Sequence, residues 1–235
     1  MRYIKKGDEP AAFRDWKARA NEDWQPTWEV LRNPEKRAVK QALLDEQGYL
    51  CAYCCQYIEY ETSHIDHVEP RAARPDLALA YENMLASCPG EPAEGDDPEP
   101  RAQRLPELKH CGHAKADWYD PERFVDPRDP DCEKAFSFTV MGQIRVAPAA
   151  PNPEAARETI ERLKLDYAPL RRQREAAIAV ELERLVQRLQ AAGRLSREDI
   201  TARIEQLQRR GDDGRFAAFM PAILDILKQR ASTLR

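Results

Sequence analysis

The feature that most constrains the fold of this chain is a stretch from residue 51 to residue 115 that collects its metal-binding side chains. All four histidines and five of the six cysteines of the 235 residues lie there. Cys51 and Cys54 have the spacing of a zinc knuckle, a tight turn that brings two thiolates together. Cys88 and Cys111 are the expected second pair. Four thiolates leave no open position for a substrate, so we predict a structural zinc site.

Composition indicates a globular protein of one or two domains, because 42% of the residues are hydrophobic and 33% are charged. No apolar run approaches the roughly 20 residues of a membrane helix, and residues 1–6 lack a signal-peptide pattern. We therefore expect a cytoplasmic protein without a membrane partner. A reducing compartment disfavours disulfides. Cys55 and Cys132 lack partners at ligand spacing and are interpreted as ordinary small residues, although Cys55 could replace a neighbouring ligand.

The formal net charge of −4 bears on any role with nucleic acid. Proteins that bind nucleic acid unaided usually carry a positive balance, because phosphate contacts supply most of the non-specific affinity. Either the positive charge of this chain is local, or a partner brings the nucleic acid.

The expected secondary structure is mainly helical, with strands near the centre. Residues 2–47 are helical in character, and a helix over 35–47 is capped by Gly48. Trp24 and Trp28 are interpreted as core residues rather than as residues that stack on nucleic-acid bases. Short strands are expected at 57–61 and 64–68, a connection with some helix at 77–85, and a β-hairpin at 136–146. Helices follow from residue 153, one of them with a capping box at Ser196 and Asp199.

Three parts of the chain follow from this pattern: a helical segment over 1–48, a core over 49–125 with a surface insertion at 89–108, and a hairpin followed by helices over 126–235. The insertion is rich in Pro, Glu, Asp and Gly. Amphipathic stripes make the C-terminal helices a candidate docking surface for a partner. Arg171, Arg172 and Arg174 either contact phosphates or form a solvated helix face.

A second set of residues, interleaved with the cysteines, suits phosphodiester hydrolysis. That reaction needs a base to activate water, a divalent ion to neutralise charge, and a group that orients the base. His67 can take the proton, and Asp66 with His113 can hold a divalent ion. Asn83 can hydrogen-bond backbone near His67. We expect a bend or strand end at these residues, because a regular strand would point Asp66 and His67 to opposite faces.

These residues resemble the motif of the HNH endonuclease family, which has a ββα-metal core between zinc knuckles. Asp66-His67 resembles the family's Asp-His, Asn83 its middle Asn, His113 its last His and Lys115 the trailing basic residue. The resemblance implies that His67 is the general base, that Asp66 and His113 bind Mg²⁺ or Mn²⁺, and that the cysteines bind zinc. This chain departs from the pattern in two ways: Cys88 lies far from Cys111, and Gly112 precedes His113. Either His113 or His110 could therefore complete the ion site.

A closer resemblance is to the PtuB-type HNH nuclease subunit of Septu anti-phage systems. It is carried by residues 1–6, 51–54, 64–70 and 111–112, and by 163–166 before an arginine-rich helix. It implies an endonuclease effector that cuts nucleic acid, with DNA the expected substrate, together with an ATPase partner of the PtuA type. The expected fold is α+β, with a small zinc-stabilised ββα-metal core inside a mainly helical protein that has one extra β-hairpin.

Two other functions remain open from the sequence. The cysteines could build a non-catalytic zinc adaptor that binds nucleic acid or protein, or the chain could be a purely structural subunit. An isolated histidine is more often a structural hydrogen-bonding residue than a ligand, and we interpret His64 and His110 in this way.

Overall fold

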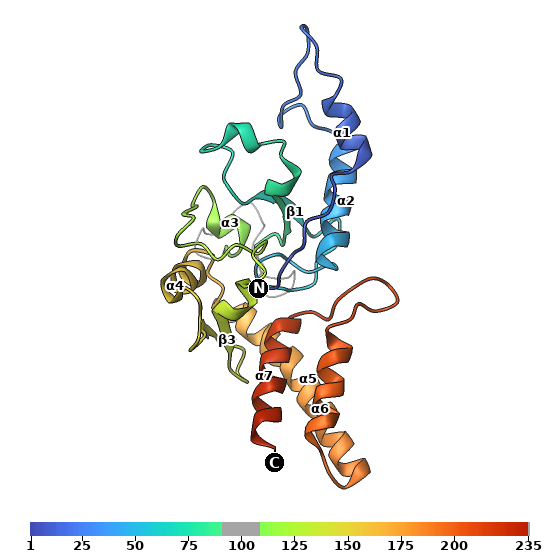
Figure 1. Ribbon diagram of the computed structural model, residues 1–235, viewed down its shortest axis with the longest axis vertical. Helices are drawn as coiled ribbons and strands as arrows, with labels where there is room; N and C mark the ends of the chain where they lie inside the picture. Colours follow the sequence, from blue (N-terminus) through green and yellow to red (C-terminus); the bar gives the residue numbers. More distant parts are fainter. Residues whose placement is uncertain (91–108, 235) are drawn as a thin grey trace, which may run out of the picture.

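The computed structural model describes residues 1–90 and 109–234, which form an elongated molecule (Figure 1). The first two helices lie at one end and the last three at the other, with the strands and short helix α3 between them. The predicted insertion falls mainly on residues 91–108, which lie outside the described residues. Within the described part of the chain, no helix has the length and apolar character needed to cross a membrane.

The N-terminal part is less helical than predicted. Helix α1 covers only Ala11–Lys17, and turns lead from there to helix α2 over Glu35–Gln47. Trp24 and Trp28 lie in these turns, partly buried against the core, as expected of packing residues. The bounds of α2 match the prediction, and Gly48 ends the helix in a left-handed conformation with φ 58°. A Cβ at this position would lie 2.2 Å from the ring of Phe216, so only glycine fits without rearrangement.

The central sheet pairs different segments from those expected. Strand β1, His64–His67, runs antiparallel to β2, Met84–Ser87, with His64 opposite Ser87 and His67 opposite Met84. The predicted strand over 57–61 is wrong, because only Tyr57 forms a bridge, with Leu50. Thr62 and Ser63 instead hydrogen-bond the backbone of Glu59 and fold the chain into a turn. All of β2 is buried, so its sequence lacks the alternation that marks a half-exposed strand.

The predicted hairpin is present. Strand β3, Phe136–Phe138, pairs with β4, Ile144–Val146, and helix α4 follows over Pro153–Arg162. The guanidinium of Arg174 donates to the carbonyl oxygens of Gly142 and Leu165, both at 2.7 Å, and fixes the hairpin turn. Arg174 is 1% exposed, so its expected role at a phosphate or on a solvated face is wrong. It is a structural cation.

Three helices form the C-terminal end: α5 over Ala168–Ala192, α6 over Arg197–Leu207 and α7 over Met220–Thr233. The predicted capping box forms at the start of α6, where Ser196 and Asp199 bond each other's backbone. Along α5, Ile178 and Leu185 are buried, whereas Val186 and Leu189 remain over 40% exposed. Helices combined with two small sheets are compatible with the predicted α+β class.

Candidate metal centre and active site

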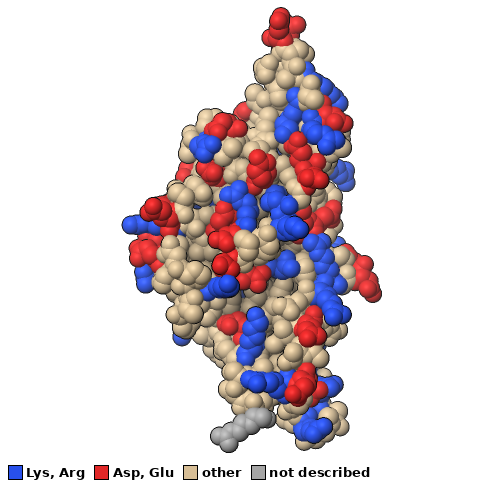
Figure 2. Space-filling view, in the orientation of Figure 1, with Lys and Arg blue, Asp and Glu red and all other residues tan. Residues whose placement is uncertain are grey.

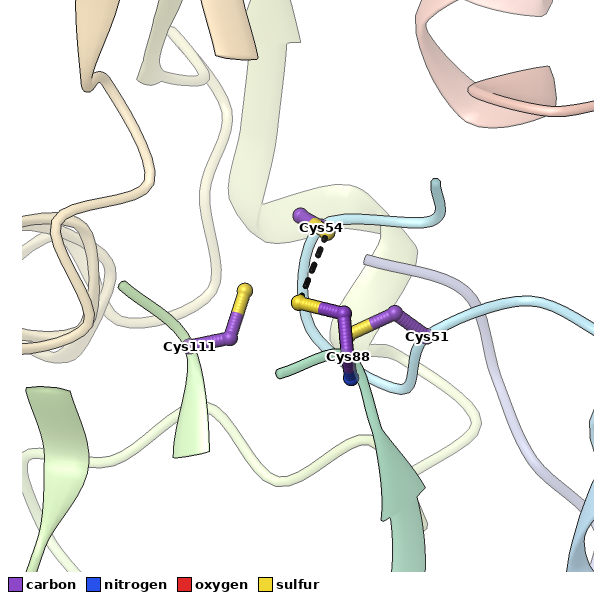
Figure 3. A group of neighbouring side chains, drawn as sticks. All are labelled: Cys51, Cys54, Cys88 and Cys111. Atoms are coloured by element: carbon purple, nitrogen blue, oxygen red, sulfur yellow. Dashed lines mark hydrogen bonds between the residues drawn. The ribbon is translucent and has the colours of Figure 1, made fainter. Parts of the chain in front are cut away.

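Four cysteines from three segments meet in the interior (Figure 3). Cys51 and Cys54 come from the turn before β1, Cys88 directly follows β2, and Cys111 directly precedes helix α3, Gly112–Lys115. Their sulfur atoms all lie within 4.8 Å of one another, and Cys54 Sγ is 3.9 Å from Cys88 Sγ. Zinc–sulfur bonds of about 2.3 Å in a tetrahedron put sulfurs about 3.8 Å apart. The group could therefore hold a zinc ion.

The electrostatics of these thiols also suit a cation. Burial would raise the pKa of the Cys51 thiol, but hydrogen bonds from the thiols of Cys111, Cys54 and Cys88 lower it well below the ordinary value. The backbone N–H of Cys88 also donates to Cys51 Sγ, at 3.3 Å. Burial raises the pKa of the Cys54 and Cys111 thiols. The lowered pKa of Cys51 favours its thiolate, which a cation bound among these buried sulfurs would stabilise.

His110 lies on the cysteine side of the site. Its Nδ1 is 3.2 Å from Cys111 Sγ and 3.8 Å from Cys88 Sγ, and the side chain is buried. Burial lowers its pKa to about 4, so the ring is neutral near pH 7. Cys55 and Cys132 are buried as well, outside the four-cysteine group.

Strand β1 carries Asp66 and His67, and it ends at His67 as expected. The Asp66 carboxylate accepts a hydrogen bond from the Tyr53 hydroxyl and lies 3.5 Å from the Lys115 ammonium. Lys115 is 1% exposed and donates to the carbonyl oxygen of His67 at 2.7 Å. The knuckle turn and helix α3 therefore both hold this strand end in place.

The ring of His67 is held in one orientation. Its Nε2 lies 3.0 Å from the carbonyl oxygen of Ala78, and Trp28 packs edge-on against the ring at 4.5 Å between centroids. A carbonyl oxygen only accepts, so Nε2 carries the proton and Nδ1 keeps its lone pair. Burial lowers the pKa of His67, which favours this neutral form.

Asn83, which is 1% exposed, performs the backbone bonding expected of it. Its side-chain oxygen accepts from the N–H of Glu69 at 2.9 Å, and its amide nitrogen donates to the Glu69 carbonyl oxygen at 3.0 Å. The amide also lies 3.4 Å from the carbonyl oxygen of Leu77. Asn83 thereby joins two segments. One directly follows His67, and the other contains Ala78, whose carbonyl oxygen bonds the His67 ring.

His113 lies beside the other face of β1. Its ring stacks on that of His64, with centroids 4.3 Å apart, and its Nδ1 bonds the carbonyl oxygen of Pro89. This bond places the proton on Nδ1 and leaves the Nε2 lone pair free. His113 is exposed, in contrast to His110.

Sequence reasoning gave no orienting role to Tyr53 and interpreted His64 as structural. Tyr53 stands between the two knuckle cysteines, and burial followed by the charge of Asp66 raises its pKa well above the ordinary value. It therefore stays protonated and donates. The sequence signal that places His64 beside Asp66 is its position two residues earlier, because alternate residues of a strand share a face.

A local group of cations lies next to this site, on α2. Lys36 lies over the ring of Trp28 at 5.0 Å, while Arg37 and Lys40 lie over Tyr60 at 5.3 and 4.4 Å. Among the described residues, none of these three cations forms an ion pair with a carboxylate. The face visible in Figure 2 mixes both signs of charge. Three cations therefore lie together on α2 in a chain whose formal net charge is −4.

Two curated relatives indicate the class of protein. A candidate HNH endonuclease of retron Vc95, from Vibrio cholerae serotype O1 biovar El Tor, is 27% identical over 161 residues, which cover 66% of this chain and 69% of the relative. A candidate HNH endonuclease of retron Ec83, from Escherichia coli, is 28% identical over 179 residues, covering 61% and 67%. No known family profile matches the chain. The two relatives support assignment to the HNH endonuclease family.

Proposed function

We propose that this protein is a metal-dependent HNH endonuclease that hydrolyses phosphodiester bonds in nucleic acid, with DNA as the expected substrate. The observation that carries the proposal is the bond between His67 Nε2 and the Ala78 carbonyl oxygen, at 3.0 Å. It presents an unprotonated Nδ1 from a rigid position beside Asp66. The descriptions of the two relatives support the same activity.

In this proposal His67 is the general base. Its Nδ1 takes the proton of the attacking water, and the Ala78 carbonyl stabilises the imidazolium that results. Asn83 is a positioning residue, because it bonds the backbone of Glu69, two residues after His67, and lies within 3.4 Å of the carbonyl oxygen of Leu77, the residue before Ala78. Lys115 is a second positioning residue through its bond to the His67 carbonyl oxygen.

Asp66 and His113 are the proposed protein ligands of a catalytic divalent ion, Mg²⁺ or Mn²⁺. The donor set fits: Asp66 offers a carboxylate oriented by Tyr53, and His113 offers Nε2 with its other nitrogen bonded to a carbonyl, as metal-binding histidines usually are. Such an ion, when bound, neutralises charge on the phosphate and on the leaving oxygen. The burial of His110 against Cys111 favours His113 over His110 for this role.

The four cysteines are proposed to hold a structural zinc ion that joins the knuckle turn, β2 and α3. These are the segments that supply Tyr53, the partner strand of β1, and Lys115. We further propose that the protein acts as the nuclease effector of an anti-phage defence complex with an ATPase partner of the PtuA type. The Septu-like motifs described above support this partner.

Plasmid cleavage in Mg²⁺ or Mn²⁺ tests the proposed activity, comparing wild type with His67→Ala, with and without the ATPase. We expect cleavage to fall by at least about 10²-fold in the variant, with zinc content and thermal unfolding unchanged. Equal cleavage by both proteins would point to another site. Binding of nucleic acid without cleavage by wild type in every combination would favour the zinc adaptor.

A further inference from the structure

We propose that a cleft beside His67 binds one unpaired nucleobase of the substrate, so that the enzyme cuts nucleic acid that is single-stranded or locally opened. This inference rests on the proposed function, because it takes His67 as the general base of a nuclease. It adds the substrate class of that site, which is a strand whose bases are free to leave the stack.

The cleft has a volume of about 380 Å³ and lies between two segments of the chain that are far apart in sequence. One wall is the turn that contains Trp28, and the other is the 3-10 helix Pro75–Leu77 with the two residues after it. The apolar lining residues are Pro26, Trp28, Pro75, Ala78 and Leu79. A concave, mainly apolar site of this size with a few polar groups suits the flat ring of a nucleobase.

The cleft shares two of its lining residues with the surroundings of the proposed general base. Trp28 packs edge-on against the His67 ring at 4.5 Å between centroids, and the Ala78 carbonyl oxygen lies 3.0 Å from His67 Nε2. A base held against Trp28 and Ala78 would therefore be one residue away from His67. This position suits a nucleotide next to the scissile bond.

Cations adjoin the aromatic wall of the cleft. Lys36 Nζ lies 5.0 Å and Arg71 Cζ 5.2 Å from the Trp28 ring centroid. Arg71 also lines the cleft and pairs with Glu29 at 3.1 Å. Both members of this pair are exposed, so the pair is weak in water and a phosphate can compete for Arg71. An apolar cleft with cations at its aromatic wall matches the two parts of a nucleotide, the face of its base and its phosphate.

The same features disfavour an intact duplex. A base inside a double helix is stacked on both faces and paired along its edge, so it must leave the helix before it can enter a cleft. A base of a single strand needs no unpairing. Sites for single strands combine a cationic path for the backbone with aromatic side chains for the bases, as this cleft does. DNA and RNA strands both carry these groups, so the experiment includes both.

Binding and cleavage of short strands by the full-length, zinc-loaded protein test this inference. We expect a single strand of DNA, of RNA or of both to be cut at least about tenfold faster than the duplex of the same sequence. A single abasic site is then moved along the strand. At one position near the mapped cut it should lower the affinity, measured without added divalent ion, and the cleavage rate by about tenfold, which is the size of one base–aromatic contact.

Three variants locate the effect. Leu79→Gln makes the cleft polar, and it should weaken binding of the intact strand and remove the effect of the abasic site. Leu189→Gln makes the same change at an exposed leucine of α5 and should keep that effect. Arg71→Gln should weaken intact and abasic strands alike, because it removes a phosphate contact rather than a base contact. The abasic scan itself uses wild type, so it decides the question even where Leu79→Gln does not fold.

The inference is overturned by a wild type that cuts duplex and single strands at equal rates, or by a scan in which no abasic position lowers affinity or rate. A folded Leu79→Gln protein with the wild-type abasic effect would overturn it as well. The failure of the proposed function looks different. A wild type that loses affinity at one abasic position but cleaves no strand would keep the base site and refute the nuclease.

Discussion

The hydroxyl of Tyr53 donates a hydrogen bond to the carboxylate of Asp66, which joins the turn between two clustered cysteines to the strand that carries His67. Tyr53 is fully buried, and its raised pKa keeps the proton on the phenol. The turn therefore orients a carboxylate as well as contributing two thiols. A change in the cysteine cluster should therefore alter the orientation of the Asp66 carboxylate.

Replacing Tyr53 by Phe tests this connection, because it removes one oxygen and keeps the ring. We expect Mn²⁺ affinity and cleavage to fall by about 10- to 100-fold, as is typical when a hydrogen bond to a metal ligand is lost. Zinc content should stay at wild-type level. Tyr49→Phe, which removes a hydroxyl bonded to Asp45, is the control. Unchanged Mn²⁺ affinity in Tyr53→Phe would show that the bond does not orient Asp66.

Zinc should be required for folding. Cys88→Ser is expected to lose the bound zinc, measured by elemental analysis, and to lower the free energy of unfolding by several kcal/mol. Cys132→Ser changes a buried cysteine outside the cluster, and there the zinc should remain. If Cys88→Ser kept both its zinc and its stability, Cys88 would not be a ligand.

On the acid side of the pH–rate profile, the cleavage rate should fall at a pH below the ordinary histidine pKa of about 6.5. His67 must be unprotonated to act as a base, and burial lowers its pKa, so the active form persists as pH falls through this value. Trp28→Ala exposes the ring and should move the limb to higher pH. Trp24→Ala removes an indole that contacts Trp16 and should not move it. The measurement is single-turnover cleavage from pH 5 to 8.

Reversing charge on α2 should weaken binding of nucleic acid without altering the chemistry. We expect Lys36→Glu with Lys40→Glu to lower the affinity and to reduce the slope of log affinity against log salt by about 2, one for each lost phosphate contact. Lys134→Glu with Arg157→Glu is the control, since both side chains pair with acids elsewhere. Equal slopes in both double variants would exclude this face from the interface.

Local patterns predicted the parts of the fold that local physics decides. Helix α2, its glycine cap, the hairpin and the capping box at Ser196 depend on residues within a few positions of each other. The pairing of β1 with β2 does not depend on such neighbouring residues. Strand β2 is fully buried and lacks alternation, and its partner lies 20 residues earlier in the sequence, so tertiary packing decided the register.

In the candidate site, too, some contacts follow from local sequence patterns and others from tertiary packing. Spacing and residue type predicted that the four cysteines would meet and that Asn83 would bond backbone near His67. The contacts of Tyr53, Lys115 and His64 were not legible, because they depend on which face of a strand meets which residue of α3. Arg174 was misinterpreted for a related reason: a helix rich in charges gives no local sign that one cation is buried under a hairpin turn.

A backbone hydrogen bond joins the two ends of the described chain that flank residues 91–108. The N–H of His110 donates to the carbonyl oxygen of Gly90 at 2.9 Å, and Cys88 and Cys111 meet just beyond that bond. A main-chain bond outside the thiol cluster therefore helps to set the spacing of Cys88 and Cys111, so the cluster depends on the backbone at Gly90 and His110 as well as on its own four sulfurs.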